Sequence, residues 1–177
     1  VTPHFFPGGD IGRLAVCGTV NDVATSGAVP QWLSVSMILE EGFALDDLKR
    51  ICASMRAAAD EAGVRVVTGD TKVVNRGHGD GIYINTSGVG VLAPGVELGG
   101  ARCAPGDKVL VTGTLGDHGI TIMSCREGLN FQADIQSDAA PLNHLIAAVL
   151  EAAPHTRCFR DPTRGGLAST LNELAEQ

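Results

Sequence analysis

The sequence contains few aromatic residues, no run of basic residues and no apolar stretch long enough to span a bilayer. Aromatic residues make up 4% of the 177 residues, and the formal net charge is −7. A chain without basic segments interleaved with aromatic side chains is not expected to bind nucleic acid. Because neither a secretory signal nor a membrane-spanning segment is recognisable, the sequence predicts a cytoplasmic protein.

Cysteine spacing excludes two further classes. The chain has five cysteines, an odd number, and no two of them have the C-x-x-C spacing of metal and redox motifs. This pattern argues against a disulfide framework and against a zinc cluster. Cys52 lies on the apolar side of an expected helix, so we expect a buried thiol there.

Small and apolar residues are abundant. Hydrophobic residues account for 44% of the chain, charged residues for 19%, and there are 23 glycines. This composition is typical of a globular protein with many tight turns. The length allows one large domain or two small ones. The stretch 94–105, rich in glycine and proline, is the best boundary, and we expect an N-terminal domain over residues 1–100 and a C-terminal domain over 101–177.

Hydrophobic periodicity and turn residues predict alternating helices and strands. A first helix follows Asp10, a plausible N-cap, and ends before Gly27; a second begins at Leu45 and ends at Gly63. Strands are expected at 32–39, 64–68, 82–92, 108–112 and 156–159, and further helices from the glycines at 113, 116 and 119 to about 126, at 139–153 and from 165 onward. Glycines within 82–92 indicate bends or bulges. The chain begins without methionine and its last helix lacks a stop signal, so we expect a piece of a longer protein.

The most informative segment is 67–74, V-T-G-D-T-K-V-V, which we expect to leave a buried strand as a loop. Gly69 permits a tight turn, and Asp70 offers oxygen ligands to a hard metal ion. After Thr71, Lys72 adds a compact cation suited to a phosphate or to proton transfer. Taken alone, the segment also fits a surface turn with a salt bridge.

Two further oxygen-rich segments lie far from this one in sequence. Asn21 and Asp22 are poor helix formers inside a helix, which fits either a solvated face or a polar pair aimed at a ligand. The segment 161–166, D-P-T-R-G-G, is ordinary turn chemistry, yet it also presents Arg164, a bidentate phosphate binder, before a helix N-terminus that favours anions. In an acidic chain with few cations nearby, a bridging Mg²⁺ would reconcile these carboxylates with a polyphosphate.

The glycine-rich segment 113–119, G-T-L-G-D-H-G, follows an expected strand and opens an expected helix. Its spacing matches neither the P-loop nor the dinucleotide fingerprint, so as a phosphate motif it is weak. Asp117 could simply cap the helix, and a single histidine such as His118 is more often structural than catalytic.

Taken together, these segments resemble the HypE family of hydrogenase maturation factors. The match runs through F-F-P-G-G-D-I-G, G-T-V-N-D-V-A-T-S-G-A, I-L-E-E-G, T-G-D-T-K-V-V, G-T-L-G-D-H-G and R-D-P-T-R-G-G, in this order, and covers nearly the whole chain. The family belongs to the superfamily of aminoimidazole-ribonucleotide synthetase, termed PurM-like, together with selenophosphate synthetase and thiamine-phosphate kinase. The combination of T-G-D-T-K-V-V with D-P-T-R-G-G favours HypE over those relatives.

The resemblance implies a PurM-like two-domain fold of the α+β and α/β type. The mixed sheet of the N-terminal domain would form a barrel shared with a second subunit, the C-terminal domain would add α/β layers, and ATP would lie in the cleft between them. The implied reaction is the ATP-dependent dehydration of a thiocarboxamide on a C-terminal cysteine to a thiocyanate, whose nitrile becomes the cyanide ligand of the [NiFe]-hydrogenase iron. Implied partners are a second copy of the chain, HypF as carbamoyl donor and the HypC–HypD complex.

By this resemblance, ATP and Mg²⁺ are the cofactors, and Asp22 and Asp161 would hold the metal with support from Asp70. Lys72, Asp70 and Arg164 are then the candidate catalytic residues. The candidate nucleotide- and phosphate-binding residues are Asn21, Asp22, Thr71, Asp117, His118 and Thr163. The family's upstream glycine-rich segment and its terminal cysteine are absent from these residues, so we expect the 177 residues alone to bind ATP weakly and to be inactive. Alternatives are a PurM-like kinase or synthetase acting on a small molecule, and a non-catalytic maturation scaffold.

Overall fold

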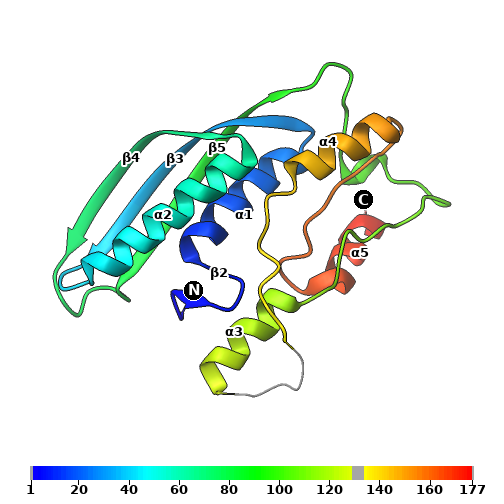
Figure 1. The fold of residues 1–177 in the computed structure, drawn as a ribbon. Coiled ribbons are helices and arrows are strands. Elements are labelled where there is room, and N and C mark those ends of the chain that lie inside the picture. The colour runs from blue at the N-terminus through cyan, green and yellow to red at the C-terminus, as the bar shows by residue number, and fades with distance from the viewer. Residues whose placement is uncertain (1, 129–133, 177) are drawn as a thin grey trace.

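The computed structural model describes residues 2–128 and 134–176 (Figure 1). Its elements in chain order are β1 (Phe5–Phe6), β2 (Gly9–Asp10), α1 (Ile11–Thr25), β3 (Ala28–Glu40), α2 (Leu45–Ala62), β4 (Arg65–Val74), β5 (Ile82–Leu92), a 3-10 helix (Gly100–Arg102), α3 (Asp117–Glu127), α4 (Asn143–Ala152) and α5 (Gly166–Glu176). Across these ranges, none of the helices combines the length and apolar character that crossing a membrane requires.

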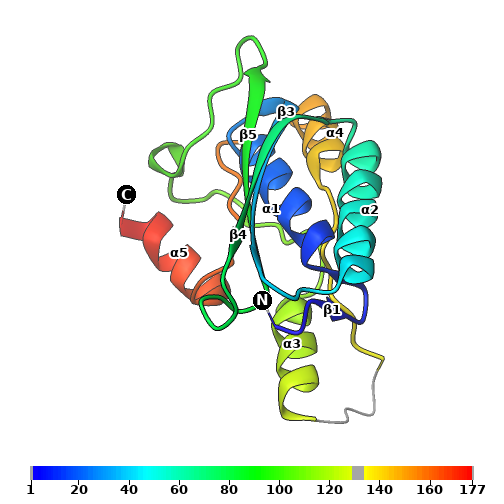
Figure 2. The ribbon, with the colours of Figure 1, turned by 90° about the vertical axis from the view of Figure 1, so that its left-hand side faces the viewer.

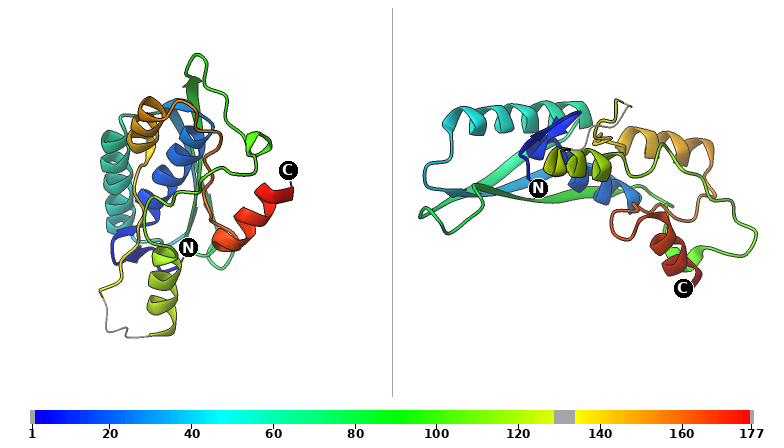
Figure 3. Two further views of the ribbon diagram at one scale, coloured as in Figure 1. Left: turned by 90° about the vertical axis from the view of Figure 1, so that its right-hand side faces the viewer. Right: turned by 90° about the horizontal axis from the view of Figure 1, so that it is seen from below.

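A three-stranded mixed sheet in the order β4-β3-β5 organises the first half of the chain. β3 pairs with β4 in parallel and with β5 antiparallel. Helices α1 and α2 both lie on one face of this sheet (Figure 2). The opposite face of the sheet carries neither of these two helices (Figure 3). The mixed sheet expected for the N-terminal part is confirmed, and its two faces have different surroundings.

The core lies between the sheet and these two helices. Alternation along β3 sends Leu33 and Val35 toward the helices, whereas Ser34 and Ser36 point to the other face. The buried apolar residues that pack together are Phe6, Ile11, Val16, Cys17, Val20, Leu33, Val35, Ile51, Met55, Ala58, Ala59, Ala62, Val64, Ile82 and Ile122. Most of them come from α1, α2 and the sheet, so this layer pair is what holds the first half of the chain together.

Local signals at the helix ends were predictive. The Asp10 carboxylate accepts hydrogen bonds from the backbone N–H groups of Gly12 (2.7 Å) and Arg13 (3.0 Å), which confirms it as the N-cap of α1. Gly63 has φ = 71° and ends α2 in the left-handed conformation that favours glycine. The expected strand 82–92 is also confirmed, with the same bounds as β5.

The expectation that the chain leaves the strand 64–68 and forms a loop from Gly69 is wrong. These residues continue β4, which pairs with β3 as far as Val74. Gly69 is not at a turn, and its backbone is not in the left-handed region. A Cβ atom at Gly69 would lie 2.6 Å from the carbonyl oxygen of Val35, just beyond a register shift in β3, so glycine is needed there for close backbone approach.

Three other expectations also fail. Residues 108–112 and 156–159 form no strand, and Leu110 is 86% exposed, because no described segment pairs with them. Helix α4 begins at Asn143 and not near residue 139. Cys52 is exposed on α2 although it lies next to the buried Ile51, because adjacent helical positions point about 100° apart.

Candidate functional site

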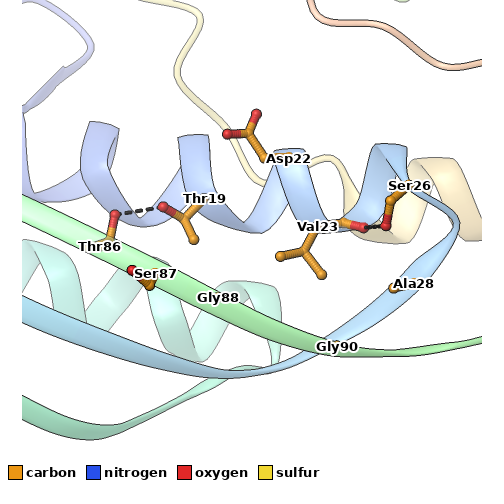
Figure 4. A pocket seen from close by; sticks show the side chains of 9 residues that line it. All are labelled: Thr19, Asp22, Val23, Ser26, Ala28, Thr86, Ser87, Gly88 and Gly90. Carbon is orange, nitrogen blue, oxygen red and sulfur yellow. Dashed lines mark hydrogen bonds between the residues drawn. The ribbon is translucent and has the colours of Figure 1, made fainter.

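A hollow of about 490 Å³ lies between the C-terminal half of α1 and strand β5 (Figure 4). Its lining consists of small and polar residues: Thr19, Asp22, Val23, Ser26, Ala28, Thr86, Ser87, Gly88 and Gly90. Among these side chains Asp22 is the one carboxylate, and it points from α1 away from the sheet. The hollow therefore combines hydroxyl groups, exposed backbone and a single acidic group.

Glycines on β5 set the distance between helix and strand here. A Cβ at Gly88 would lie 2.8 Å from Cγ2 of Val23 and 2.9 Å from Cγ2 of Thr19, and one at Gly90 would lie 2.6 Å from Cγ1 of Val23. Helix α1 thus sits directly on β5 where the strand lacks side chains. The sequence predicted bends or bulges at these glycines, and a register shift in the pairing with β3 does lie next to Gly90. The glycines also leave room for the helix.

Hydroxyl groups fix this contact. The hydroxyls of Thr19 and Thr86 lie 2.6 Å apart, and the Thr86 hydroxyl also lies 3.0 Å from the carbonyl oxygen of Ala15, to which it donates. Sequence reasoning missed these residues and Ser87. The alternation T-S-G-V-G-V at 86–91 was a usable signal, because it places Thr86, Gly88 and Gly90 on the same face of the strand.

Asp161, which the sequence predicted to act together with Asp22 from a distant segment, does influence the Asp22 carboxylate. Although the Asp22 side chain reaches solvent, burial of its surroundings raises its pKa, the Asp161 charge raises it further, and Arg160 opposes both effects. Asp161 accepts a hydrogen bond from the Thr163 hydroxyl and lies 3.5 Å from Nη1 of Arg160. A carboxylate whose pKa is raised by a second carboxylate fits a divalent cation site, because a bound cation would relieve the repulsion.

The described residues do not gather three acidic ligands around one point. Asp70 and Lys72 pair with Ser36 and Ile38 in the parallel register, so they project from the face of the sheet opposite α1. The Asp70 carboxylate instead accepts from the N–H of Thr71 (2.8 Å) at the outer edge of β4. One copy of the chain therefore does not bring Asp70 to the face of the sheet on which Asp22 lies, and a common site for Asp22, Asp70 and Asp161 stays a prediction.

The side-chain amide of Asn21 forms hydrogen bonds within the fold. Its Nδ2 donates to the carbonyl oxygen of Ala140 (3.0 Å), and its Oδ1 accepts from the N–H of Leu142 (2.7 Å). Both ends of the amide are used to attach the segment before α4 to α1. These bonds show that the side chain supports the fold, and its predicted contact with phosphate stays a prediction.

Asp117 and His118 lie elsewhere. They begin α3, which packs against β1 near the N-terminal end of α1, whereas Asp22 lies near its other end (Figure 1). The His118 ring packs edge-on against Phe6 with centroids 5.3 Å apart, its Nδ1 lies 2.9 Å from the Ser137 hydroxyl, and burial lowers its pKa. Asp117 accepts from the Thr114 hydroxyl, and Gly116, not Asp117, is the N-cap. These contacts give both residues a structural role, and their binding of a nucleotide stays a prediction.

Arg164 and Thr163 lie in the loop that leads into α5, where Gly165 and Gly166 have positive φ values of 71° and 64°. Arg164 is exposed and forms no ion pair with any residue in 2–128 or 134–176, unlike its neighbour Arg160, which lies 3.0 Å from Glu173. A cation without a protein partner, next to Asp161, remains available to an anionic ligand.

Replacing Asp22 by asparagine is expected to raise the melting temperature of the cation-free protein by about 1–2 °C, because a repelled carboxylate is removed. The folded-state pKa of Asp22 is raised, so its contribution to stability is present below the unfolded pKa and is lost as pH rises through the folded value. The gain should therefore grow from acid to neutral pH. Thermal melts across that range measure it.

The matched control for this change is Asp46→Asn, since Asp46 is exposed in the first turn of α2 and pairs with Lys49 at 3.1 Å. That variant should not gain stability, because Asp46 lies where the helix dipole favours a negative charge. Added Mg²⁺ should stabilise the parent and the Asp46 variant but not the Asp22 variant. Equal stabilisation of all three would contradict a cation site at Asp22.

Two family models cover the chain: AIR synthase related protein, N-terminal domain, over residues 1–92, and the C-terminal domain of the same family over residues 104–177. The chain is 63% identical over 177 residues to carbamoyl dehydratase HypE of Azotobacter vinelandii, a match that includes all of this chain and 52% of that protein. The resemblance to HypE inferred from the sequence motifs is thereby confirmed. The chain spans about half the length of the curated relatives it matches.

Solved structures give the same result. A HypE–HypF complex superposes with a TM-score of 0.97 and 54% identity, covering 99% of this chain and 58% of that one. HypE in complex with ATP superposes with a TM-score of 0.94 and 55% identity, covering 99% and 52%. The expected PurM-like fold is confirmed by these matches.

Proposed function

Because the chain belongs to the AIR synthase related protein family, we propose that it is the core of an ATP-dependent carbamoyl dehydratase of the HypE type. The observation that carries the proposal is the match to HypE along the entire chain, in sequence and in fold. A small-molecule kinase is the weaker alternative, because the T-G-D-T-K-V-V and D-P-T-R-G-G segments that distinguish HypE are both present.

The proposed reaction converts a cysteine thiocarboxamide, R–S–C(O)–NH₂, and ATP into the thiocyanate R–S–C≡N, ADP and phosphate. An amide oxygen is a poor leaving group. Transfer of the γ-phosphoryl group to that oxygen turns it into phosphate, and a base then removes the protons from nitrogen as the C≡N bond forms. The nitrile would supply cyanide to the iron of a [NiFe]-hydrogenase.

The residues divide this work. Asp22 and Asp161 would hold Mg²⁺, because the charge of Asp161 acts on the Asp22 carboxylate and the Arg160 guanidinium beside Asp161 offsets this only in part. When bound, the metal supplies positive charge at the phosphates. Arg164, exposed and unpaired within the described ranges, is suited to charge that develops on the transferred phosphoryl group. The small, hydroxyl-lined hollow beside Asp22 would admit part of the nucleotide.

Lys72 and Asp70 require a second subunit in this scheme, because in one chain they project from the opposite face of the sheet. We propose that two copies associate through those faces, so that the strands of both surround the site. The face carries exposed apolar side chains, among them Trp32, Ile38 and Val89, the last 59% exposed. Several exposed apolar side chains on one face of a sheet are typical of a protein interface. HypF and the HypC–HypD complex are the further partners we propose. HypF is included because the solved chain that superposes on this one comes from a HypE–HypF complex.

The oligomeric state tests the association. The parent is expected to sediment as a dimer, and the double substitution Val89→Glu and Val91→Glu should yield a monomer, because it buries charges in an apolar contact. Val91 is exposed on the same face of β5 as Val89. Leu45→Glu, at an exposed position on the start of α2, is the control and should remain dimeric. A monomeric parent at high concentration would refute the proposal.

The reaction is tested on the full-length protein after S-carbamoylation of its C-terminal cysteine. Addition of Mg-ATP should remove one water from the modified peptide, measured by mass spectrometry, with one ADP formed for each nitrile. ATP consumption without loss of water would point to the kinase alternative. Neither change in a correctly folded protein would support a scaffold.

A further inference from the structure

Two cysteines that the proposed reaction does not use lie side by side in the second half of the chain. Cys103 follows the 3-10 helix Gly100–Arg102, and Cys158 lies in the irregular segment that leads to Asp161. Both side chains are partly buried, so neither is sealed from solvent. The segments that carry them are distant in sequence, and the fold has brought them together.

Residues that precede the two cysteines in the sequence hold their segments together. The N–H of Gly99 donates to the carbonyl oxygen of Arg157 (2.9 Å), and Nη1 of Arg157 donates to the carbonyl oxygen of Arg102 (2.9 Å). The Arg157 side chain also lies 3.5 Å from the Asp107 carboxylate. Contacts therefore connect the segment on both sides of Cys103 to the residue directly before Cys158.

The thiols themselves interact. Burial raises the pKa of the Cys158 thiol, and the charge of Cys103 and a side-chain hydrogen bond with it raise that pKa further, whereas Arg160 lowers it. Such an effect of one thiol on another requires close approach. Cys158 also donates to the carbonyl oxygen of Phe159 at 3.4 Å.

The other cysteines have no such partner arrangement. Cys17 is buried in the core, and burial raises its pKa to about 11. Cys52 and Cys125 are exposed on α2 and α3. Within the described ranges, no third histidine, cysteine or carboxylate joins the pair to complete a metal site. Two thiols alone do not satisfy the four ligands of structural zinc, so the pair is better suited to a bond between the sulfurs.

We propose that Cys103 and Cys158 are a redox modification site, which a hydroperoxide converts to an intramolecular disulfide. One thiolate attacks a peroxide oxygen, the O–O bond breaks, and sulfenic acid and hydroxide form. The second thiol then displaces hydroxide from the sulfenic sulfur, the S–S bond forms, and water leaves. In sum, two thiols and H₂O₂ give one disulfide and two waters, and a dithiol reductant reverses the change. This proposal does not depend on the dehydratase reaction.

Peptide mapping of the full-length protein tests the pair. The reduced protein is treated with equimolar H₂O₂, its remaining thiols are blocked with N-ethylmaleimide, and a non-reducing digest is analysed by mass spectrometry. We expect a peptide pair linked through Cys103 and Cys158, lighter by two hydrogens than the sum of its parts, which dithiothreitol separates. If both residues are instead recovered as maleimide adducts or as sulfinic acids, the proposal is refuted.

Substitutions sharpen the experiment. In Cys103→Ser the thiol of Cys158 should stay open to maleimide after oxidation, whereas in Cys125→Ser, an exposed control, the linked peptides should form as in the parent. Cys103→Ala serves if the serine variant fails to fold. Linkage of Cys158 to an exposed cysteine of another molecule, seen as a covalent dimer on a non-reducing gel, would also overturn the assignment.

Discussion

Replacing Lys72 by alanine in the full-length protein is expected to reduce the rate of carbamoyl dehydration by about 100- to 10,000-fold, the range for loss of a positioned proton-transfer group. Lys72 is on β4, exposed, and its strand neighbours hold it at a defined register opposite Ile38. The stability of the fold should not change, because the side chain packs in no core. The rate is read from the loss of water by mass spectrometry.

Lys49→Ala is the matched control, because Lys49 is an exposed lysine whose partner is Asp46 on the surface of α2. Its rate should equal that of the parent. Lys72→Arg separates charge from proton transfer: arginine keeps the positive charge but does not release a proton at neutral pH, so a severe defect in this variant favours the proton-transfer role. Parental activity in Lys72→Ala would remove Lys72 from the reaction.

Replacing Leu33 by alanine is expected to lower the free energy of unfolding by about 2–5 kcal/mol, which is the cost of lost burial plus a cavity in a packed core. Leu33 is 1% exposed and lies on the central strand β3, beneath α1 and α2. It also approaches Gly88, since a Cβ on that glycine would lie 3.3 Å from Cδ2 of Leu33. A loss of this residue therefore loosens the contact that shapes the hollow beside Asp22.

Leu45→Ala makes the same chemical change at a position that is 70% exposed, and it should cost less than about 0.5 kcal/mol. Urea denaturation of both variants gives the comparison, with equal m-values as the sign that the same transition is observed. Similar losses at the two positions would mean that the interface between sheet and helices is not the main source of stability.

Much of the first half of the fold could be predicted from the sequence because the signals for its elements are local. Asp10 caps a helix with its own side chain, and Gly63 ends one through its own backbone conformation. The strand 82–92 has turn residues on both sides and alternating side chains between them. In each case the physical cause lies within a few residues, so no knowledge of distant segments was needed.

The segments whose secondary structure was predicted wrongly are those whose conformation depends on a pairing strand. Residues 69–74 were predicted to be a loop because Gly-Asp-Thr-Lys is polar, yet they pair with β3 as far as Val74. Residues 108–112 read as a strand by composition, yet no described segment pairs with them. Strand formation is decided by the neighbour as much as by the residues themselves.

The candidate site divides in the same way. The sequence alone determined the family, and its motifs predicted the side chains that carry the chemistry, namely Asp22, Lys72, Asp161 and Arg164. Only the tertiary structure decided how they are grouped. It lets the Asp161 charge act on Asp22, and it bonds Asn21 to the segment before α4. It also places Asp70 and Lys72 on the face of the sheet opposite α1. The reason is that residue type sets what a group can do, whereas the packing of a helix on a sheet sets which groups can meet.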